Sequence, residues 1–290
     1  MLSHARLVLI SVAVCVLSLA VSALLETGDA GLFGVPTLPA LALICFAIQW
    51  VALIPAYLAQ TEHFYDLTGA LTYACVVVIA LWLGPATPRA LLLGALVLIW
   101  CSRLGGFLFR RVRRDGKDGR FDAIKPDFGR FCLAWTLQGL WVFLTLLAAL
   151  VAMGQAHAAH LDLWAATGLL IWCAGFVIEV VADGQKSTFK QQAGNAGRFI
   201  DSGLWAWSRH PNYFGEILLW TGVCVIAIPA FSGWQWLGLV SPVFVAILLI
   251  KGSGIPLLEQ RADEKWGGQP DYERYKALTP VLIPRPPRRA

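Results

Sequence analysis

Long apolar runs separated by short polar links dominate the chain. A helix needs about 20 apolar residues to cross a hydrocarbon core about 30 Å thick, because all of its backbone hydrogen bonds must close within the segment. The runs of this length lie approximately at residues 5–25, 38–60, 67–84, 89–109, 131–153, 161–182, 212–230 and 234–250. The pattern predicts an all-α fold, a polytopic integral membrane helical bundle with about eight transmembrane helices.

The composition supports a membrane protein. Hydrophobic residues make up 58% of the chain and charged residues 14%, whereas soluble domains carry about 25% charged residues. Arg6 before the first run and the small residues 21–23 after it also fit a signal peptide, but we interpret this run as the first span. The seven cysteines all fall within predicted spans without a C-x-x-C pair, so we interpret them as packing residues and predict no metal site.

The distribution of positive charge predicts the topology. Residues 110–130 contain eight lysines and arginines, whereas the links at 26–37, 85–88, 154–160 and 231–233 contain none. By the positive-inside rule both termini and the long basic links face the cytoplasm. We therefore expect a multi-pass protein of the bacterial inner membrane with its active site on the cytoplasmic side. Its expected partners are membrane lipids and a lipid substrate, and we expect no nucleic acid.

The C-terminal segment Leu257–Pro287 is polar. It begins as a short charged helix, breaks at "GGQP" and resumes through Tyr272 and Tyr275 before a proline-rich end. We expect this segment to cap the bundle at the cytoplasmic membrane surface. The alternative is a solvated positive tail that touches anionic lipids.

The stretch "RHPNYFGE" places polar groups at the start of the seventh span. Pro211 suits the first position of a helix, so the span should start there. The free amides of a helix start attract anions, which predicts a binding edge for a phosphate-bearing or otherwise anionic ligand. The alternative is an anchor that meets lipid headgroups. The residues of this edge are Arg209, His210, Asn212, Tyr213, Glu216 and Trp220.

The end of the sixth span carries two carboxylates. Glu179 and Asp183 are four residues apart on one helical face, and a charge within a bilayer costs about 2.5–3.5 kcal/mol on insertion scales. They therefore suggest a polar cavity, and the following Lys186, Lys190 and Arg198 can offset phosphate charge. The alternative is that Asp183 only ends the helix near the interface.

A third polar group, in "TEHFYDLTGALTY", lies at the start of the third span. Glu62 and Asp66 are expected on one helical face, with Tyr65 beside them and Tyr73 deeper in the span. A buried carboxyl there could act as a general acid toward a substrate oxygen. Acidic residues in a first helical turn are also ordinary capping groups.

Motifs of soluble nucleotide-binding folds, nucleophile elbows and zinc proteases are absent from the sequence. The histidines have no metal-ligand spacing. No pair of matching broken helices, typical of transporters, occurs in the two halves.

Two stretches carry a family resemblance. "SRHPNYFGE" and "SGIPLLEQRADEKWG" with the following tyrosine pair, over Glu179–Pro284, resemble the membrane-embedded steroid 5α-reductase superfamily, most closely its bacterial branch DUF1295. The resemblance extends more weakly back to about Thr61. We therefore expect two extra transmembrane helices at 1–60 and a steroid-reductase-like domain at 61–290 with a C-terminal cytoplasmic cap at 255–290.

The resemblance implies an NADPH-dependent oxidoreductase that transfers hydride to a conjugated C=C of a steroid-like or other lipid enone. Glu179 stands where the reductases have an asparagine, and Lys190 replaces an arginine. The cofactor contacts that the resemblance implies are Glu179, Asp183, Lys190, Asn212, Glu216, Trp220, Arg261 and Tyr272. Arg198 and the edge residues Arg209, His210 and Tyr213 complete the expected cofactor site.

The implied substrate end departs from the family. The reductases hold the ketone oxygen with a glutamate and a tyrosine, whose positions are taken by Asp66 and Trp100. An indole N–H can donate a hydrogen bond but cannot give up a proton as an acid. Tyr65 or Tyr73 would then supply the missing hydroxyl, and Glu62 is a second carboxyl candidate.

Isoprenylcysteine and phospholipid methyltransferases share a similar "RHP.Y.G" start. Their cofactor, S-adenosylmethionine, carries a sulfonium that favours acidic neighbours and needs no cationic phosphate clamp. The cations expected in the pocket favour the negatively charged NADPH instead. They are Lys186, Lys190, Arg198, Arg209 and Arg261. A lipid methyltransferase and a non-catalytic lipid-binding protein remain the alternatives.

Overall fold

Most of the described chain is helical, with almost no strand. The computed structural model describes residues 3–26, 31–32, 34–115, 119 and 121–287. Within these residues, eight helical segments are long and apolar enough to cross a membrane, which confirms the predicted polytopic bundle. They are His4–Leu25, Thr37–Leu58, Tyr65–Leu83, Pro88–Arg113, Phe128–Met153, Leu163–Gln191, Pro211–Ala230 and Gly233–Trp266.

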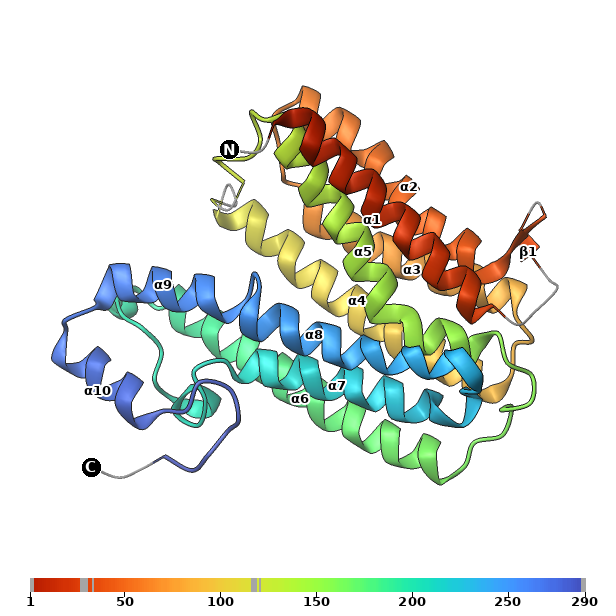
Figure 1. Cartoon of the computed structure of the whole chain (residues 1–290). Coiled ribbons are helices and arrows are strands. Elements are labelled where there is room, and N and C mark those ends of the chain that lie inside the picture. Colours follow the sequence, from red (N-terminus) through yellow and green to blue (C-terminus); the bar gives the residue numbers. More distant parts are fainter. Residues whose placement is uncertain (1–2, 27–30, 33, 116–118, 120, 288–290) are drawn as a thin grey trace. The chain divides into compact units, whose positions relative to one another are not determined.

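Two compact units make up the fold: Met1–Ala165 with Ile226–Ser241, and Ala166–Val225 with Pro242–Ala290. The first unit contains five long helices, of which α5 packs against each of the other four (Figure 1). All residues from Thr145 to Met153 in α5 are buried, as expected for a central apolar helix. The elements of this unit are α1 (His4–Leu25), β1 (Gly31–Leu32), β2 (Val35–Pro36), α2 (Thr37–Leu58), α3 (Tyr65–Leu83), α4 (Pro88–Asp115), α5 (Phe128–Met153), η3 (Ile228–Ala230) and η4 (Gly233–Leu239).

A buried arginine fastens the start of α4. The Arg89 guanidinium donates to the backbone oxygens of Ala158 and His160, both at 2.7 Å, and to that of Ile226 at 2.5 Å. Asp162 adds an ion pair at 3.1 Å. A buried charge is costly unless its hydrogen bonds are made, and these contacts meet that requirement. Arg89 therefore has a structural role in this unit.

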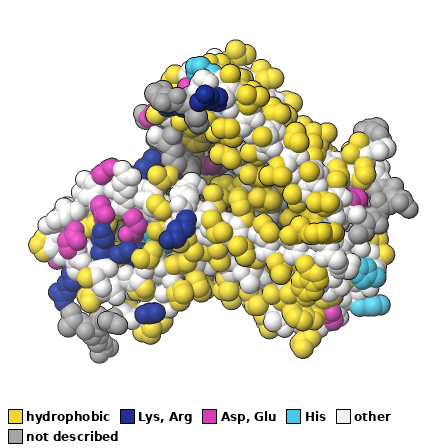
Figure 2. Space-filling model, viewed as in Figure 1, with side chains coloured by type: hydrophobic (Ala, Val, Ile, Leu, Met, Phe, Trp, Pro, Cys, Tyr) yellow, Lys and Arg dark blue, Asp and Glu magenta, His cyan; other side chains and the backbone are white. Residues whose placement is uncertain are grey.

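The second unit contains most of α6, α7 and α8 and the whole C-terminal cap. Helix α7 begins at Pro211, as predicted, and the cap consists of α9 and α10 separated at Gly267 and Gly268, also as predicted. Figure 2 shows charged side chains gathered over α9 and α10, in contrast to the hydrophobic surface of α1–α5. The elements are α6 (Leu163–Gln191), η1 (Ala193–Asn195), η2 (Gly203–Ala206), α7 (Pro211–Ala227), α8 (Val240–Lys251), α9 (Ile255–Trp266) and α10 (Pro270–Leu278).

Glycines allow α6 and α7 to touch through their backbones. A Cβ atom added to Gly215 would lie 2.6 Å from the backbone oxygen of Gly175, and one added to Gly222 would lie 2.6 Å from that of Gly168. Small residues at helix crossings within membranes permit this close approach. The crossing brings the polar residues of the two helices together.

Candidate functional site

Four polar residues meet where α6 and α7 cross. Glu179, Asp183 and Glu216 are only 2%, 8% and 7% exposed, and the Asn212 amide donates to Asp183 Oδ1 at 3.2 Å. The sequence predicted one polar face on each helix, and the fold joins the two faces. We call Glu179, Asp183, Asn212 and Glu216 the α6–α7 polar face.

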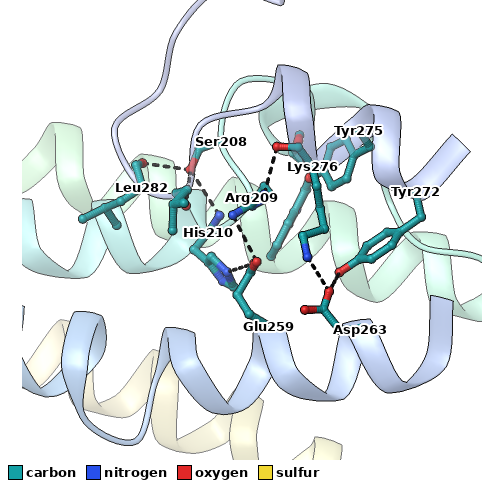
Figure 3. A network of polar contacts seen from close by, with 11 residues as sticks. Ser208, Arg209, His210, Glu259, Asp263, Tyr272, Tyr275, Lys276 and Leu282 are labelled. Atoms are coloured by element: carbon teal, nitrogen blue, oxygen red, sulfur yellow. Dashed lines mark hydrogen bonds and ion pairs between the residues drawn. The ribbon is translucent and has the colours of Figure 1, made fainter. Parts of the chain in front are cut away.

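Arg209 and His210, directly before α7, share one carboxylate partner. Glu259 of α9 accepts from Arg209 Nη2 at 3.0 Å and contacts His210 Nε2 at 2.8 Å (Figure 3). Arg209 Nη1 also donates to the backbone oxygen of Lys276 at 3.0 Å. The positive charge that the sequence suggested for an anionic ligand is therefore balanced within the protein. Glu259 was not among the residues predicted from the sequence.

His210 is an almost fully buried imidazole. His210 is 5% exposed. Its ring stacks on the ring of Tyr213, with 5.7 Å between the ring centroids. Burial lowers the pKa of His210, helped by the nearby charges of Lys186 and Arg209 and opposed by Glu259. The neutral ring then donates from Nε2 to Glu259, which leaves Nδ1 buried without a hydrogen-bond partner among the described residues.

A second carboxylate organises the cap. Asp263, one turn after Glu259 on α9, accepts from the Tyr272 hydroxyl at 3.0 Å and from Lys276 Nζ at 2.6 Å (Figure 3). Burial and the hydrogen bond to Asp263 raise the pKa of Tyr272, and the same carboxylate raises the pKa of Lys276. Tyr272, an implied cofactor contact, is thus a protonated member of the cap network.

The chain after α10 is held against the segment that leads into α7. Ser208 Oγ donates to the backbone oxygen of Leu282 at 2.8 Å, and the Arg209 amide donates to that of Pro280 at 2.9 Å. Further on, the Arg285 amide donates to the backbone oxygen of Trp207 at 2.9 Å. The proline-rich end is therefore an ordered part of the second unit.

The remaining predicted cofactor residues belong to the same unit but lie outside this network. Lys186 Nζ lies 4.3 Å from the centre of the Trp205 ring, and Trp220 is buried. The other three, Lys190, Arg198 and Arg261, are exposed.

The predicted substrate residues belong to the first unit. The expectation that Glu62 and Asp66 share a helical face is wrong, because α3 begins at Tyr65 and Glu62 lies in the preceding turn. Glu62 is 3% exposed and forms an ion pair with Lys125 at 2.5 Å. Asp66 pairs with Arg111 at 3.5 Å. Each carboxylate thus has its own cation.

The two candidate tyrosines have different surroundings. The Tyr65 hydroxyl donates to the backbone oxygen of Ala134 at 2.9 Å, so it serves the packing of α3 on α5. The buried Tyr73 ring meets that of Trp100 edge to face at 5.1 Å. Tyr73 follows Asp66 by seven residues, so both lie on one face of α3. Trp100, which occupies the position of the family tyrosine, is therefore in direct contact with a tyrosine from the neighbouring helix.

Comparisons with known proteins give the family. Residues 50–279 match the family described as "Protein of unknown function (DUF1295)". "Uncharacterized protein C594.04c" of Schizosaccharomyces pombe is 26% identical over 234 residues, covering 69% of this chain and 64% of that protein, so the chain spans less than two thirds of this relative's length. No solved structure matches the chain significantly. Because the family match covers most of its length, the chain belongs to the DUF1295 family, which is a steroid 5α-reductase-like family.

Proposed function

We propose that this protein is a membrane-embedded NADPH-dependent reductase that saturates a conjugated C=C of a steroid-like or other lipid enone. The observation that carries the proposal is the α6–α7 polar face. It joins Asp183 and Asn212 by a hydrogen bond and buries Glu179 and Glu216 beside them. These are positions at which the family resemblance implies cofactor contacts.

The residues of the second unit fit the chemistry of NADPH. Carboxylates accept hydrogen bonds from ribose hydroxyls and from an amide, and the α6–α7 polar face is rich in them. The exposed cations Lys190, Arg198 and Arg261 could pair with phosphates. When bound, NADPH would supply the hydride for the reduction.

The first unit would hold the substrate carbonyl. Asp66 is paired with Arg111, and a carboxylate in an ion pair accepts hydrogen bonds without donating them. We therefore assign the donor role to the Tyr73 hydroxyl, with Trp100 packed against the ring to fix its position. A donor placed where negative charge develops on oxygen is typically worth about 10²–10³ in turnover.

We also propose that the protein lies in the bacterial inner membrane with the polar cap facing the cytoplasm. The basic residues 110–130 support this orientation through the positive-inside rule. A cytoplasmic cap would place the cofactor residues where soluble nucleotides occur.

A second candidate function is a lipid methyltransferase that uses S-adenosylmethionine. It is favoured by one observation, the burial of three carboxylates, Glu179, Asp183 and Glu216, on the α6–α7 polar face. Such a negative environment suits a sulfonium cation.

Ligand-dependent stabilisation of the detergent-purified protein tests the proposal. A ligand at 100 times its dissociation constant adds about 2.7 kcal/mol to the native state, which raises the thermal midpoint. We expect NADPH to stabilise the wild type and to stabilise Asn212→Ala and Glu216→Gln much less. Stabilisation by S-adenosylmethionine alone would replace the reductase by the methyltransferase. Stabilisation by neither would favour a non-catalytic lipid-binding role.

A further inference from the structure

A hollow of about 370 Å³ lies beside the last two turns of α6. Gln185, Thr188 and Phe189 line it from α6, and Gln192, Ile200, Ser202 and Gly203 line it from the segment that follows α6. Sites for small molecules typically measure about 300–1,000 Å³ and combine an apolar or aromatic wall with a few polar groups. The hollow has this size, is open to solvent, and has a wall of Phe189 and Ile200 with polar groups on its other sides. Within the described part of the chain, the predicted site residues do not line it.

The two glutamine amides that line the hollow are held in place by the protein. Gln185 Oε1 accepts from the Leu204 amide at 2.9 Å, and Gln192 Oε1 accepts from Asn195 Nδ2 at 2.8 Å. These hydrogen bonds orient the two side chains, and their NH₂ groups are the candidate contacts for a ligand. They are donors, and the ring nitrogens of a purine are acceptors.

Tight packing fixes Gln185 further. Gly203 has a φ of +61°, and a Cβ atom there would lie 2.5 Å from Gln185 Nε2. Only glycine tolerates both the backbone conformation and this contact. The loop is thus built around the glutamine side chain.

The aromatic wall is also supported from behind. Phe189 packs against the buried cluster of Ala182, Ile200 and Trp205. A fixed aromatic ring is a suitable stacking surface for a nucleobase, and such stacking strengthens binding by about 5- to 150-fold per base.

The charges around the hollow suit a neutral group. Among the residues that the structure describes, no lysine or arginine lines the hollow, and the C-terminal end of α6 carries a partial negative charge. Lys186 and Lys190 lie on the neighbouring face of the same helix. A phosphate would therefore lie nearer the lysines, while a base and its ribose would occupy the hollow.

From these observations we infer that the hollow beside the end of α6 binds an adenosine moiety. Phe189 stacks on the purine, and the amides of Gln185 and Gln192 donate to its edge. The inference rests on the proposed function for the identity of the ligand, which is NADPH. The adenosine group is also common to NADH, adenosine monophosphate and S-adenosylmethionine, so it can be tested separately from the reductase proposal.

Calorimetry of the full-length protein in detergent tests the inference with NADPH, NADH, adenosine monophosphate and S-adenosylmethionine as probes. We expect Phe189→Leu to weaken NADPH and adenosine monophosphate about tenfold, within the range of about 5- to 150-fold for base stacking. We expect Gln192→Leu to weaken both about fivefold through loss of a hydrogen bond. The matched control is Gln191→Leu, which changes the preceding, exposed glutamine outside the lining and should bind like the wild type. The thermal midpoint of each variant without ligand confirms that it is folded.

The possible outcomes separate the two proposals. If only S-adenosylmethionine binds and the hollow variants weaken it, the adenosine site is supported and the reductase is overturned. If NADPH binds with equal affinity to the wild type and both hollow variants, the adenosine site is overturned while the reductase stands. If none of the four probes binds the wild type, the adenosine site is overturned.

Discussion

Glu259 and His210 lie 49 residues apart in the chain, yet a carboxylate oxygen of Glu259 lies 2.8 Å from His210 Nε2. The same carboxylate holds Arg209. Since Arg209 and His210 directly precede α7, this contact ties the C-terminal cap to the helix that carries Asn212 and Glu216. The cap is therefore linked by this contact to the start of α7, the helix that contributes half of the α6–α7 polar face.

Removing the charge of Glu259 should loosen the cap. Glu259→Gln leaves the largely buried Arg209 without its ion-pair partner, and breaking a hydrogen bond to a charged group costs about 1.5–3 kcal/mol. We expect faster tryptic cleavage at Lys265 and Lys276, measured by mass spectrometry under native conditions. Glu264→Gln is the control, because Glu264 is exposed and accepts a hydrogen bond from Gln260 on the same helix. Equal cleavage rates in the two variants would contradict the role of Glu259.

His210 should make the protein sensitive to mild acid. Burial holds the pKa of folded His210 below its ordinary value of 6.5, whereas in the unfolded chain it protonates near that value. Protonation thus favours unfolding: the stability from neutral His210 is complete above about pH 6.5 and is lost as the pH falls through the lower pKa of the folded state. The groups that face His210 include Glu259, which opposes this shift, and Lys186 and Arg209, which strengthen it.

The measurement for this prediction is the thermal midpoint as a function of pH. Between about pH 7.5 and 5.5, the range in which an ordinary histidine titrates, the midpoint of the wild type should fall more than that of His210→Gln. Parallel curves would show that another group causes the acid sensitivity.

The close contact between α6 and α7 at Gly215 should not accommodate an alanine side chain. Gly215→Ala places a Cβ 2.6 Å from Gly175 O and 2.7 Å from Glu179 N, so the helices must move apart. Overpacking typically costs about 1–3 kcal/mol, and the separation should also weaken nucleotide binding. Gly184→Ala on α6 is the control, because a Cβ there meets nothing within 4 Å and alanine favours a helix by about 1 kcal/mol. If the two variants had the same thermal midpoint, the backbone contact would not be the determinant of the crossing.

The sequence was sufficient to predict the helical spans, because their length and apolar composition follow directly from the thickness of a bilayer. Pro211 likewise predicted the start of α7, and "GGQP" predicted the break between α9 and α10. Helices α4 and α6 continue beyond the predicted apolar runs, to Asp115 and Gln191. Lysine, arginine and glutamine are good helix formers, so polarity did not end these helices.

The partners of the site residues could not be predicted. The contacts of Glu62 with Lys125 and of Arg209 with Glu259 join segments far apart in sequence, and helical spacing gives information only within one helix. The placement of Glu62 failed for a related reason, since a helix start is uncertain by one or two residues when no proline or cap marks it. Within α9, the spacing of Glu259 and Asp263 was the available signal for the cap network.

Tyr73 should contribute to turnover without contributing to cofactor affinity. Tyr73→Phe keeps the ring that packs on Trp100 but removes the proposed hydrogen bond to the substrate oxygen, so we expect about 10²-fold lower kcat or more with unchanged NADPH binding. Tyr65→Phe is the matched control, because its hydroxyl serves the backbone of Ala134. If Tyr65→Phe and not Tyr73→Phe lost turnover, the donor role would pass to Tyr65.

The most direct test of the central claim is a double-label transfer experiment. Purified protein in lipid vesicles is incubated with a panel of steroid and isoprenoid enones, NADPH deuterated at the transferable position, and S-adenosylmethionine carrying a labelled methyl group. The account predicts saturated ketones that carry deuterium at the former β-carbon, with loss of this product in Tyr73→Phe. Lipids that carry the labelled methyl group and no deuterium would contradict it and establish a methyltransferase instead.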